Sequence, residues 1–361
     1  MSNNWLAMLN SYALDNLSAE ATREELTAYA ASTDVQMADL SSQTIIEVTG
    51  TDATAFLQGQ LCNDIALVSP TQAQITGYCT PKGRLLALPT IVGFESGYRL
   101  LLPADVAPAF LKRLSMFVMR SEVTIKVLED WVATAIVESS SAQPGTLEAH
   151  LGALPVGALS TASAENVQLI RWHDDNSGAH IGKAGSKSRA RYLRLAPVSD
   201  QLTLWQGADD VVKRSANVWR LSDISAGIPS ITQGIVESFV PQMINLQLIN
   251  GLSFTKGCYP GQEIVARMQY LGKLKRHMQV FKCSTATPVT HFTDSMVPGG
   301  SLSSGTDENA GIVVDAMPLS ASAFLILAVT KVAAVDAGFS VADIPLEALD
   351  MPYDLPSLEV A

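Results

Sequence analysis

The side chains best suited to chemistry fall in one short stretch, residues 254–267, which has the sequence FTKGCYPGQEIVAR. Two glycines and a proline predict a shaped loop from Lys256 to Gly261, followed by a helix. A thiol at a helix N-terminus and close to a lysine is favoured as a thiolate. Cys258 would then be ready to bind iron, accept sulfur or form a transient adduct. We therefore take Cys258 and Lys256 as the candidate catalytic residues, with a buried, inert cysteine as the alternative.

Four further polar residues of this stretch are candidates for ligand binding or for scaffolding. Tyr259 would line a ligand slot, whereas Gln262 and Glu263 could bond the loop backbone instead of a ligand. Arg267 lies four residues after Glu263, which is the spacing of a structural ion pair on a helix.

Two basic islands stand out in a chain whose net charge is −11. Residues 256–282 hold six cations against one acid, and residues 183–194 hold five cations against none. Such islands indicate either a local anionic ligand or a pair of solvated turns. The acidic balance of the whole chain argues against strong direct binding to nucleic acid.

Composition limits the class of protein. With 361 residues, 47% of them hydrophobic, the chain can form two or three domains with a large core. No apolar run approaches the ~20 residues that span a bilayer, and we recognise no secretory signal, so no direct membrane contact is expected. The four cysteines show no CxxC spacing, which predicts reduced thiols and a cytoplasmic location. The scattered histidines predict no metal site.

The pattern around these residues predicts an α+β fold. Two tandem α+β units, residues 1–130 and 131–275, would precede a small C-terminal β-barrel at 276–361. In the first unit we expect strands at 44–50 and 123–128 and helices at 53–61 and 105–116. In the second we expect strands at 132–137, 167–172 and 191–195 and helices at 209–218 and 262–270. The clearest barrel strands are 279–282, 311–314 and 324–330.

The flanks of the central stretch complete a longer motif. FVPQMINL at 239–246 and GLSF at 251–254 precede the KGCYPGQE loop, and YLGKLKR follows at 270–276. Together these segments resemble the signature of the YgfZ family, a relative of the aminomethyltransferase (T-protein) of the glycine cleavage system. Weaker similarity covers roughly residues 40–280.

This resemblance implies both a fold and a function. Family members have two α+β units and a barrel around a central cleft, the T-protein-like folate-binding fold. They bind tetrahydrofolate or a derivative, and they support the assembly or repair of iron–sulfur client proteins, including enzymes that modify tRNA. Trp219 matches a family tryptophan implicated in folate contact, although it could be an ordinary core residue. A second family tryptophan would fall near Gln43 and is absent here.

The resemblance assigns cofactor-binding roles to Trp219, Tyr259, Gln262, Glu263, Arg267 and the position of Gln43. It argues against aminomethyl transfer, because the aspartate that orients folate in the T-protein would fall within Leu86–Leu88, which is wholly apolar. Two alternatives remain open: an active folate-dependent aminomethyltransferase, and a non-catalytic scaffold that binds partner proteins.

Overall fold

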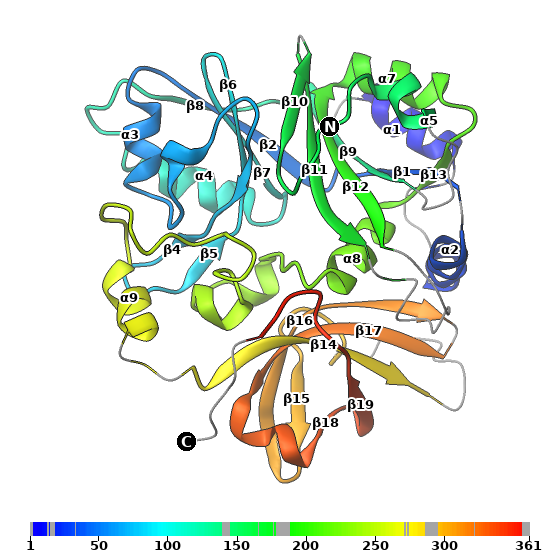
Figure 1. Cartoon of the computed structure of the whole chain (residues 1–361), viewed down its shortest axis with the longest axis vertical. Coiled ribbons are helices and arrows are strands. Elements are labelled where there is room, and N and C mark those ends of the chain that lie inside the picture. Colours follow the sequence, from blue (N-terminus) through cyan, green and yellow to red (C-terminus); the bar gives the residue numbers. More distant parts are fainter. Residues whose placement is uncertain are drawn as a thin grey trace.

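Two β-sheets lie side by side above a β-barrel in the computed structural model of the chain (Figure 1). The structure describes residues 3–355 apart from 13, 15–18, 33, 139–144, 165, 176, 178–187, 271, 273, 286–294 and 321. This arrangement confirms the predicted α+β class with two α+β units and a C-terminal barrel.

The first unit is built on an antiparallel five-stranded sheet. Its strand order is β3 (Gln74–Ile75), β6 (Thr90–Phe94), β7 (Gly97–Pro103), β2 (Gln43–Thr49) and β8 (Thr124–Val127). Alternate residues point to opposite faces, so Ile46 and Val48 pack beneath the helices α3 (Ala53–Gln58) and α4 (Ala107–Ser115). Ile45 points the other way, into the core shared with the second unit. A hairpin of β4 (Tyr78–Cys79) and β5 (Leu85–Ala87) lies apart from the main sheet, after the 3₁₀ turn η1 (Ile65–Leu67).

The second unit is built on a six-stranded sheet. Its strand order is β10 (Thr161–Ala164), β11 (Val167–Asp175), β12 (Arg189–Pro197), β9 (Trp131–Val137), β1 (Gln36–Asp39) and β13 (Val212–Arg214). The outer face packs on α1 (Asn3–Ser11) and α7 (Val198–Gly207), where the rings of Trp5 and Trp205 meet edge to face at 5.4 Å. The short helix α5 (Thr146–Leu151) adds Leu147 to the same cluster. The inner face contributes Ala133 and Ala135 to the core shared with the first unit.

The predicted helix at 209–218 is wrong, because this segment contains the short strand β13 and the start of a different helix. Val212 and Lys213 pair in parallel with Gln36 and Met37 of β1, far away in sequence. Helix α8 (Ala216–Ser225) begins after Ser215, whose hydroxyl accepts a hydrogen bond from the Asn217 N–H. Nonlocal pairing and a serine cap therefore override the local helical pattern.

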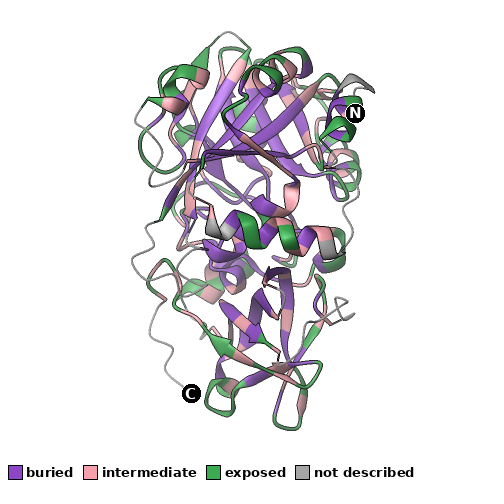
Figure 2. Ribbon diagram, turned by 90° about the vertical axis from the view of Figure 1, so that its right-hand side faces the viewer, coloured by how far each residue is buried: buried purple, intermediate pink, exposed green. Residues whose placement is uncertain are grey.

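The N-terminal segment packs with the second unit, which differs from the expected division at residue 130. Strand β1 joins the second sheet, and α1 covers its outer face. Helix α2 (Ala19–Ala31) packs against α8 and against the barrel, and Figure 2 shows it lying across the middle of the molecule. Its Tyr29 hydroxyl donates to Asp175 at 2.9 Å. The described elements of the N-terminal segment, α1, α2 and β1, therefore tie the second unit to the barrel.

The C-terminal strands close into a barrel, as predicted. The strand order is β14 (Arg276–Ser284), β17 (Ala323–Lys331), β16 (Asp307–Ser320), β15 (Ser301–Ser304), β18 (Phe339–Val341) and β19 (Ile344–Ala348), with the 3₁₀ turn η4 (Val332–Ala337) after β17. Phe281, Phe324 and Phe339 fill its interior. Asn245, which follows the turn η3 (Pro241–Ile244), donates to the Met278 carbonyl at 2.8 Å and joins the barrel to the chain before it.

The basic island at 183–194 is not a solvated turn where the structure describes it. Arg189, Arg191 and Arg194 are all buried, because β12 runs between β11 and β9 in the sheet. Arg189 forms an ion pair with Asp175, and Arg191 forms one with Asp223 at 2.7 Å. Lys183 and Lys187 lie outside the described residues. These arginines hold the inside of the second unit together instead of presenting charge to solvent.

His173, on β11, should make the protein sensitive to mild acid. Burial, with the nearby charge of Arg191, lowers the pKa of His173 to about 4, and its Nε2 atom is buried without a partner among the described residues. Between pH 6.5 and about 4 the unfolded chain therefore binds a proton that the folded chain does not, so stability falls as the pH falls. We expect His173→Gln to remove up to about 3 kcal/mol of this loss. Urea unfolding of both proteins at pH 7 and pH 4.5 measures the difference, and equal losses would contradict the assignment.

Candidate functional site

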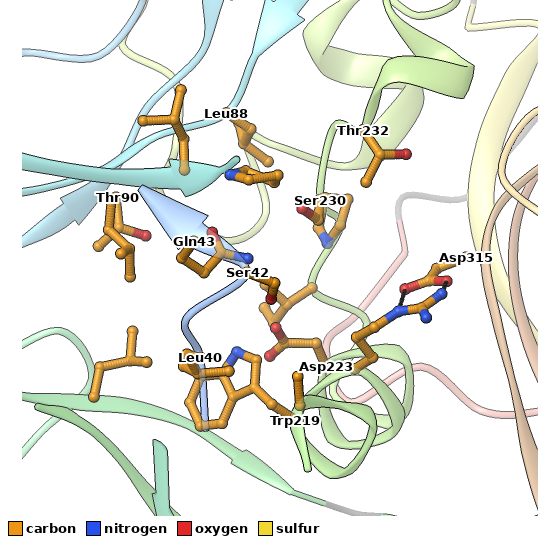
Figure 3. A pocket seen from close by; sticks show the side chains of 18 of the residues that line it. Leu40, Ser42, Gln43, Leu88, Thr90, Trp219, Asp223, Ser230, Thr232 and Asp315 are labelled. Carbon is orange, nitrogen blue, oxygen red and sulfur yellow. Dashed lines mark hydrogen bonds and ion pairs between the residues drawn. The ribbon is translucent and has the colours of Figure 1, made fainter. Parts of the chain in front are cut away.

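A cavity of about 430 Å³ lies where the two units, α8 and the barrel meet. Its walls come from β2 and β7 of the first unit, from β11, β12 and α8 of the second, and from β16 of the barrel (Figure 3). Most of the lining is apolar: Leu40, Ile75, Leu88, Leu101, Leu102, Leu193, Ile224 and Ile228. The polar side chains of the lining are Ser42, Gln43, Thr90, Asp105, Arg220, Asp223, Ser230, Thr232 and Asp315.

Two tryptophans form an aromatic wall. The rings of Trp172 and Trp219 lie 5.8 Å apart at a tilt of 41°, and both line the cavity. The guanidinium of Arg191 lies 4.5 Å from the Trp219 ring centroid. This cation–π contact helps to hold the indole in place. Trp219 is thus both a packed core residue and a cavity residue, so the two interpretations of its sequence position are compatible.

A partly buried carboxylate, that of Asp223 with 18% of its side chain exposed, stands beside this wall. The Oδ1 atom of Asp223 accepts hydrogen bonds from Trp172 Nε1 at 2.9 Å and from Arg191 Nη1 at 2.7 Å. Within the described part of the chain, no hydrogen bond is recorded for its other carboxylate oxygen. Burial raises the pKa of Asp223, and the charge of Arg191 opposes that rise. The cavity therefore offers one fixed acceptor to a ligand that carries N–H groups.

The barrel side of the cavity carries an ion pair. Arg220 of α8 bonds to both carboxylate oxygens of Asp315 on β16, at 2.5 and 3.2 Å. The Arg220 side chain is 45% exposed, so its remaining donors face solvent. On the opposite wall stand Leu88 and Thr90, with Gln43 nearby (Figure 3). Leu88 belongs to the wholly apolar run 86–88.

The structure does not place Lys256 where it could act as a donor to Cys258. Its ammonium is buried and donates to three backbone carbonyls, those of Gln58 at 2.7 Å, Leu61 at 2.6 Å and Asn63 at 2.8 Å. An ammonium has three N–H donors, so none is left for a thiol. Burial lowers the pKa of Lys256 to about 8. Lys256 is therefore an anchor that fastens the loop to the end of α3.

The remaining loop residues divide into buried and exposed ones. Tyr259 is buried, with the Lys256 Nζ atom 5.4 Å from its ring centroid, and Gln262 donates to the Lys256 carbonyl at 3.4 Å. Glu263 and Arg267 are exposed on α9 (Gln262–Tyr270), which confirms the predicted helix. No ion pair between these two described residues is recorded, despite their spacing.

The loop does not reach the cavity, although the family resemblance assigns Tyr259 and Trp219 to one ligand. No residue of 256–267 lines the cavity, and Cys258 is exposed. Figure 1 shows α9 at one side of the molecule, well away from α8. The cause is packing at Gly261, whose φ is +85° and whose missing Cβ would lie 2.5 Å from the Thr80 carbonyl oxygen. This contact docks the loop on the turn at 80–83 of the first unit.

Four cavity residues are missing from the prediction, Trp172, Arg220, Asp223 and Asp315, as are the contacts of Arg191 with Trp219 and Asp223. The available signal was the sequence around Trp219, since Arg220 and Asp223 follow it within one helical turn. The predicted helix ends at residue 218, so Arg220 and Asp223 are not recognised as neighbours of Trp219 on one helix. Among the described residues, no group of three or more His, Cys, Asp or Glu side chains could hold a metal ion.

Comparison with known proteins defines the family. The chain is 29% identical over 257 residues to the tRNA-modifying protein YgfZ of Colwellia psychrerythraea, covering 71% of this chain and 74% of that protein. It is 30% identical over 233 residues to the YgfZ protein of Edwardsiella ictaluri, covering 64% and 66%. No protein-family model matches the chain. In the described part of the structure, no helix is long and apolar enough to cross a membrane.

A solved structure defines the fold. The crystal structure of the glycine cleavage system aminomethyltransferase T from Bartonella henselae superposes with a TM-score of 0.72 over 96% of both chains, at 13% identity. At that identity the likeness concerns the fold alone. The relatives in sequence and the neighbour in structure agree with the motif of residues 239–276: the chain belongs to the YgfZ family and has the fold of aminomethyltransferase T.

Proposed function

We propose that the protein binds a reduced folate, tetrahydrofolate or a derivative, in the central cavity. One observation carries this proposal: an aromatic wall stands next to the partly buried carboxylate of Asp223, whose second oxygen accepts no hydrogen bond from the described residues. A pterin is a flat ring with adjacent N–H donors on one edge, and it needs an apolar slot with a few converging polar groups. Trp219 supplies a face for the ring, and Asp223 supplies an acceptor for its edge.

The size and charge of the cavity support the same ligand. Its volume of about 430 Å³ falls within the ~300–1,000 Å³ typical of sites for small molecules. A folate tail ends in carboxylates, which form strong charge-assisted hydrogen bonds with arginine. Arg220 is half exposed beside the cavity and would meet such a tail. Of the residues predicted from the family to contact folate, Gln43 and Trp219 would do so here, whereas Tyr259, Gln262, Glu263 and Arg267 would serve the loop.

We further propose that the folate-bound protein serves iron–sulfur client proteins in the cytoplasm and, through them, tRNA modification. The relatives carry the name of tRNA-modifying proteins. All four cysteines are free, which fits a compartment that keeps thiols reduced. Aminomethyl transfer is disfavoured, because the resemblance places the folate-orienting aspartate of the T-protein within residues 86–88. Leu88, which lines the cavity there, has no carboxylate. A glycine-cleavage assay with the lipoyl carrier separates these two functions, and we expect no turnover.

Binding of 5-formyltetrahydrofolate tests the ligand. We expect Asp223→Asn to weaken binding by about tenfold or more, because the amide offers the pterin edge a weaker acceptor and removes the charge. Asp174→Asn is the matched control: Asp174 forms an ion pair with Arg171 on the same sheet but does not line the cavity. Calorimetry on both variants and the wild type gives the affinities. Equal affinities in all three proteins would place the ligand elsewhere, and no binding to the wild type would favour the scaffold alternative.

A further inference from the structure

The end of the described chain packs back against the middle of the molecule. After β19, residues 349–355 form no helix or strand, and we call them the C-terminal strap. The Leu349 N–H donates to the Val280 carbonyl at 2.9 Å, which ties the start of the strap to β14. Leu349, Met351 and Tyr353 pack on the core that the two units share with the barrel. Figure 1 shows the strap, in red, running between the barrel and the units above it.

The hydroxyl of Tyr353 joins two other segments of the chain. It donates a hydrogen bond to the Gly227 carbonyl at 2.9 Å, just after α8, and it accepts one from the Asn245 side chain at 3.3 Å. The same Asn245 amide donates to the Met278 carbonyl at 2.8 Å. Burial raises the pKa of Tyr353, so the hydroxyl keeps the proton that it donates. One side chain of the strap thus fastens the end of α8 to the segment that meets the barrel.

Gly227 is the elbow between α8 and the chain that follows it. Its φ of +63° is left-handed, and the N–H groups of Gly227 and Ile228 donate to carbonyls in the last turn of α8. These two bonds form a Schellman cap, which ends a helix at a glycine and turns the chain away. A Cβ at Gly227 would lie 2.7 Å from the Met351 Cε atom and 3.0 Å from the Tyr353 Oη atom. The strap therefore lies directly against the backbone of the elbow.

Both sides of this elbow are walls of the cavity (Figure 3). The wall before it, on α8, includes Trp219 and Asp223, and the wall after it consists of residues 228–230 and Thr232. The Ile228 N–H donates to the Asp223 carbonyl at 2.9 Å, so the conformation of the elbow sets how the two walls face each other. The strap does not line the cavity. Its influence on a ligand would therefore pass through the elbow.

We propose that Tyr353 is a positioning residue of the cavity: its hydroxyl holds the elbow at Gly227 and so keeps the wall at 228–232 in place against α8. The inference rests on the proposed function for the identity of the ligand, a reduced folate. A wall that is not held must be ordered when the ligand binds, and that ordering lowers the affinity. The barrel would thus contribute to binding twice, through Asp315 inside the cavity and through Tyr353 outside it.

Tyr353→Phe tests the proposal, because phenylalanine keeps the ring in the core and removes only the hydroxyl. Tyr98→Phe is the matched control: the Tyr98 hydroxyl also makes a hydrogen bond, to Thr54 at 2.7 Å, but Tyr98 lies in the first unit and does not line the cavity. We expect the affinity for 5-formyltetrahydrofolate to fall about fivefold in Tyr353→Phe and to stay within about twofold of wild type in the control. Calorimetry measures both. An equal affinity in the two variants would overturn the proposal.

Hydrogen exchange of the ligand-free protein separates the role of Tyr353 from the identity of the ligand. The N–H groups of Gly227 and Ile228 report on the elbow directly, because both are bonded to α8. We expect Tyr353→Phe to speed exchange in peptides covering 224–232 about fivefold, because the elbow then opens more often. Peptides from β7, on another wall of the cavity, should exchange as in the wild type.

The two measurements together give distinct outcomes. Faster exchange at the elbow, in a protein whose wild type binds no folate, would support the positioning role and overturn the proposed ligand. Exchange at 224–232 equal to that of the wild type would overturn the positioning role, whatever the ligand.

Discussion

Replacing Lys256 by methionine should lower the free energy of unfolding by about 3 kcal/mol, because three largely buried carbonyls lose their donor at once. Methionine keeps the apolar stem of the side chain, so the loss reports the ammonium and not the packing. The carbonyls of Gln58, Leu61 and Asn63 all lie at the end of α3 or just beyond it, where helical carbonyls have no partner of their own. Urea unfolding at pH 7 measures the effect.

The same variant should show a pH dependence of defined sign. The folded chain holds the pKa of Lys256 at about 8, against 10.5 for an ordinary lysine. Between these values the unfolded chain binds the extra proton, so the wild type gains stability relative to Lys256→Met as the pH rises from 8 to 10.5. Lys82→Met, at an exposed turn, is the matched control and should change stability by no more than about 0.5 kcal/mol at any pH. A Lys256→Met effect as small as the control's would show that the three hydrogen bonds of the Lys256 ammonium do not stabilise the fold.

Local signals were sufficient for some elements and insufficient for others. Helix α9 is predicted correctly because Pro260 and Gly261 mark its start and its apolar residues recur at helical spacing. The barrel is predicted correctly because short strands alternate with glycine-rich and proline-rich turns. The segment 209–218 is mispredicted because β13 exists only through its pairing with β1, about 175 residues earlier in the chain. A window of local sequence does not contain that partner.

The candidate site shows the same limit at the level of single residues. Lys256 and Cys258 are close in sequence, which suggested activation of a thiol, but the lysine side chain reaches carbonyls almost two hundred residues upstream. Asp223 looks like an ordinary helix-surface carboxylate until β11 and β12 bring Trp172 and Arg191 to it. Sequence resemblance located Trp219, one member of this cluster, because a matched motif carries a position. The resemblance did not predict which residues contact Trp219, and those contacts form the cavity wall.

Replacing Cys258 by alanine should leave folding and folate affinity nearly unchanged and should sharply reduce function in cells. The thiol is exposed, so its removal takes away little buried area, and burial contributes only ~25 cal/mol per Å². The residue lies outside the cavity, so binding of 5-formyltetrahydrofolate should stay within a few-fold of wild type. Function should fall because the other three cysteines are buried and none can present sulfur at the surface.

Cys258→Ser distinguishes sulfur chemistry from shape. Serine keeps the size of the side chain and its hydrogen bonding, but it loses the thiolate and the affinity for soft metals. We expect it to fail as alanine does when thiolated tRNA and iron–sulfur enzyme activity are measured in a strain that lacks the native gene. Cys283→Ser, at a buried position in the barrel, controls for the general loss of a thiol, provided that the variant protein accumulates to the wild-type level. Full rescue by Cys258→Ser would mean that the exposed loop acts through its shape, which would make it a docking element for a partner protein in place of a reactive centre.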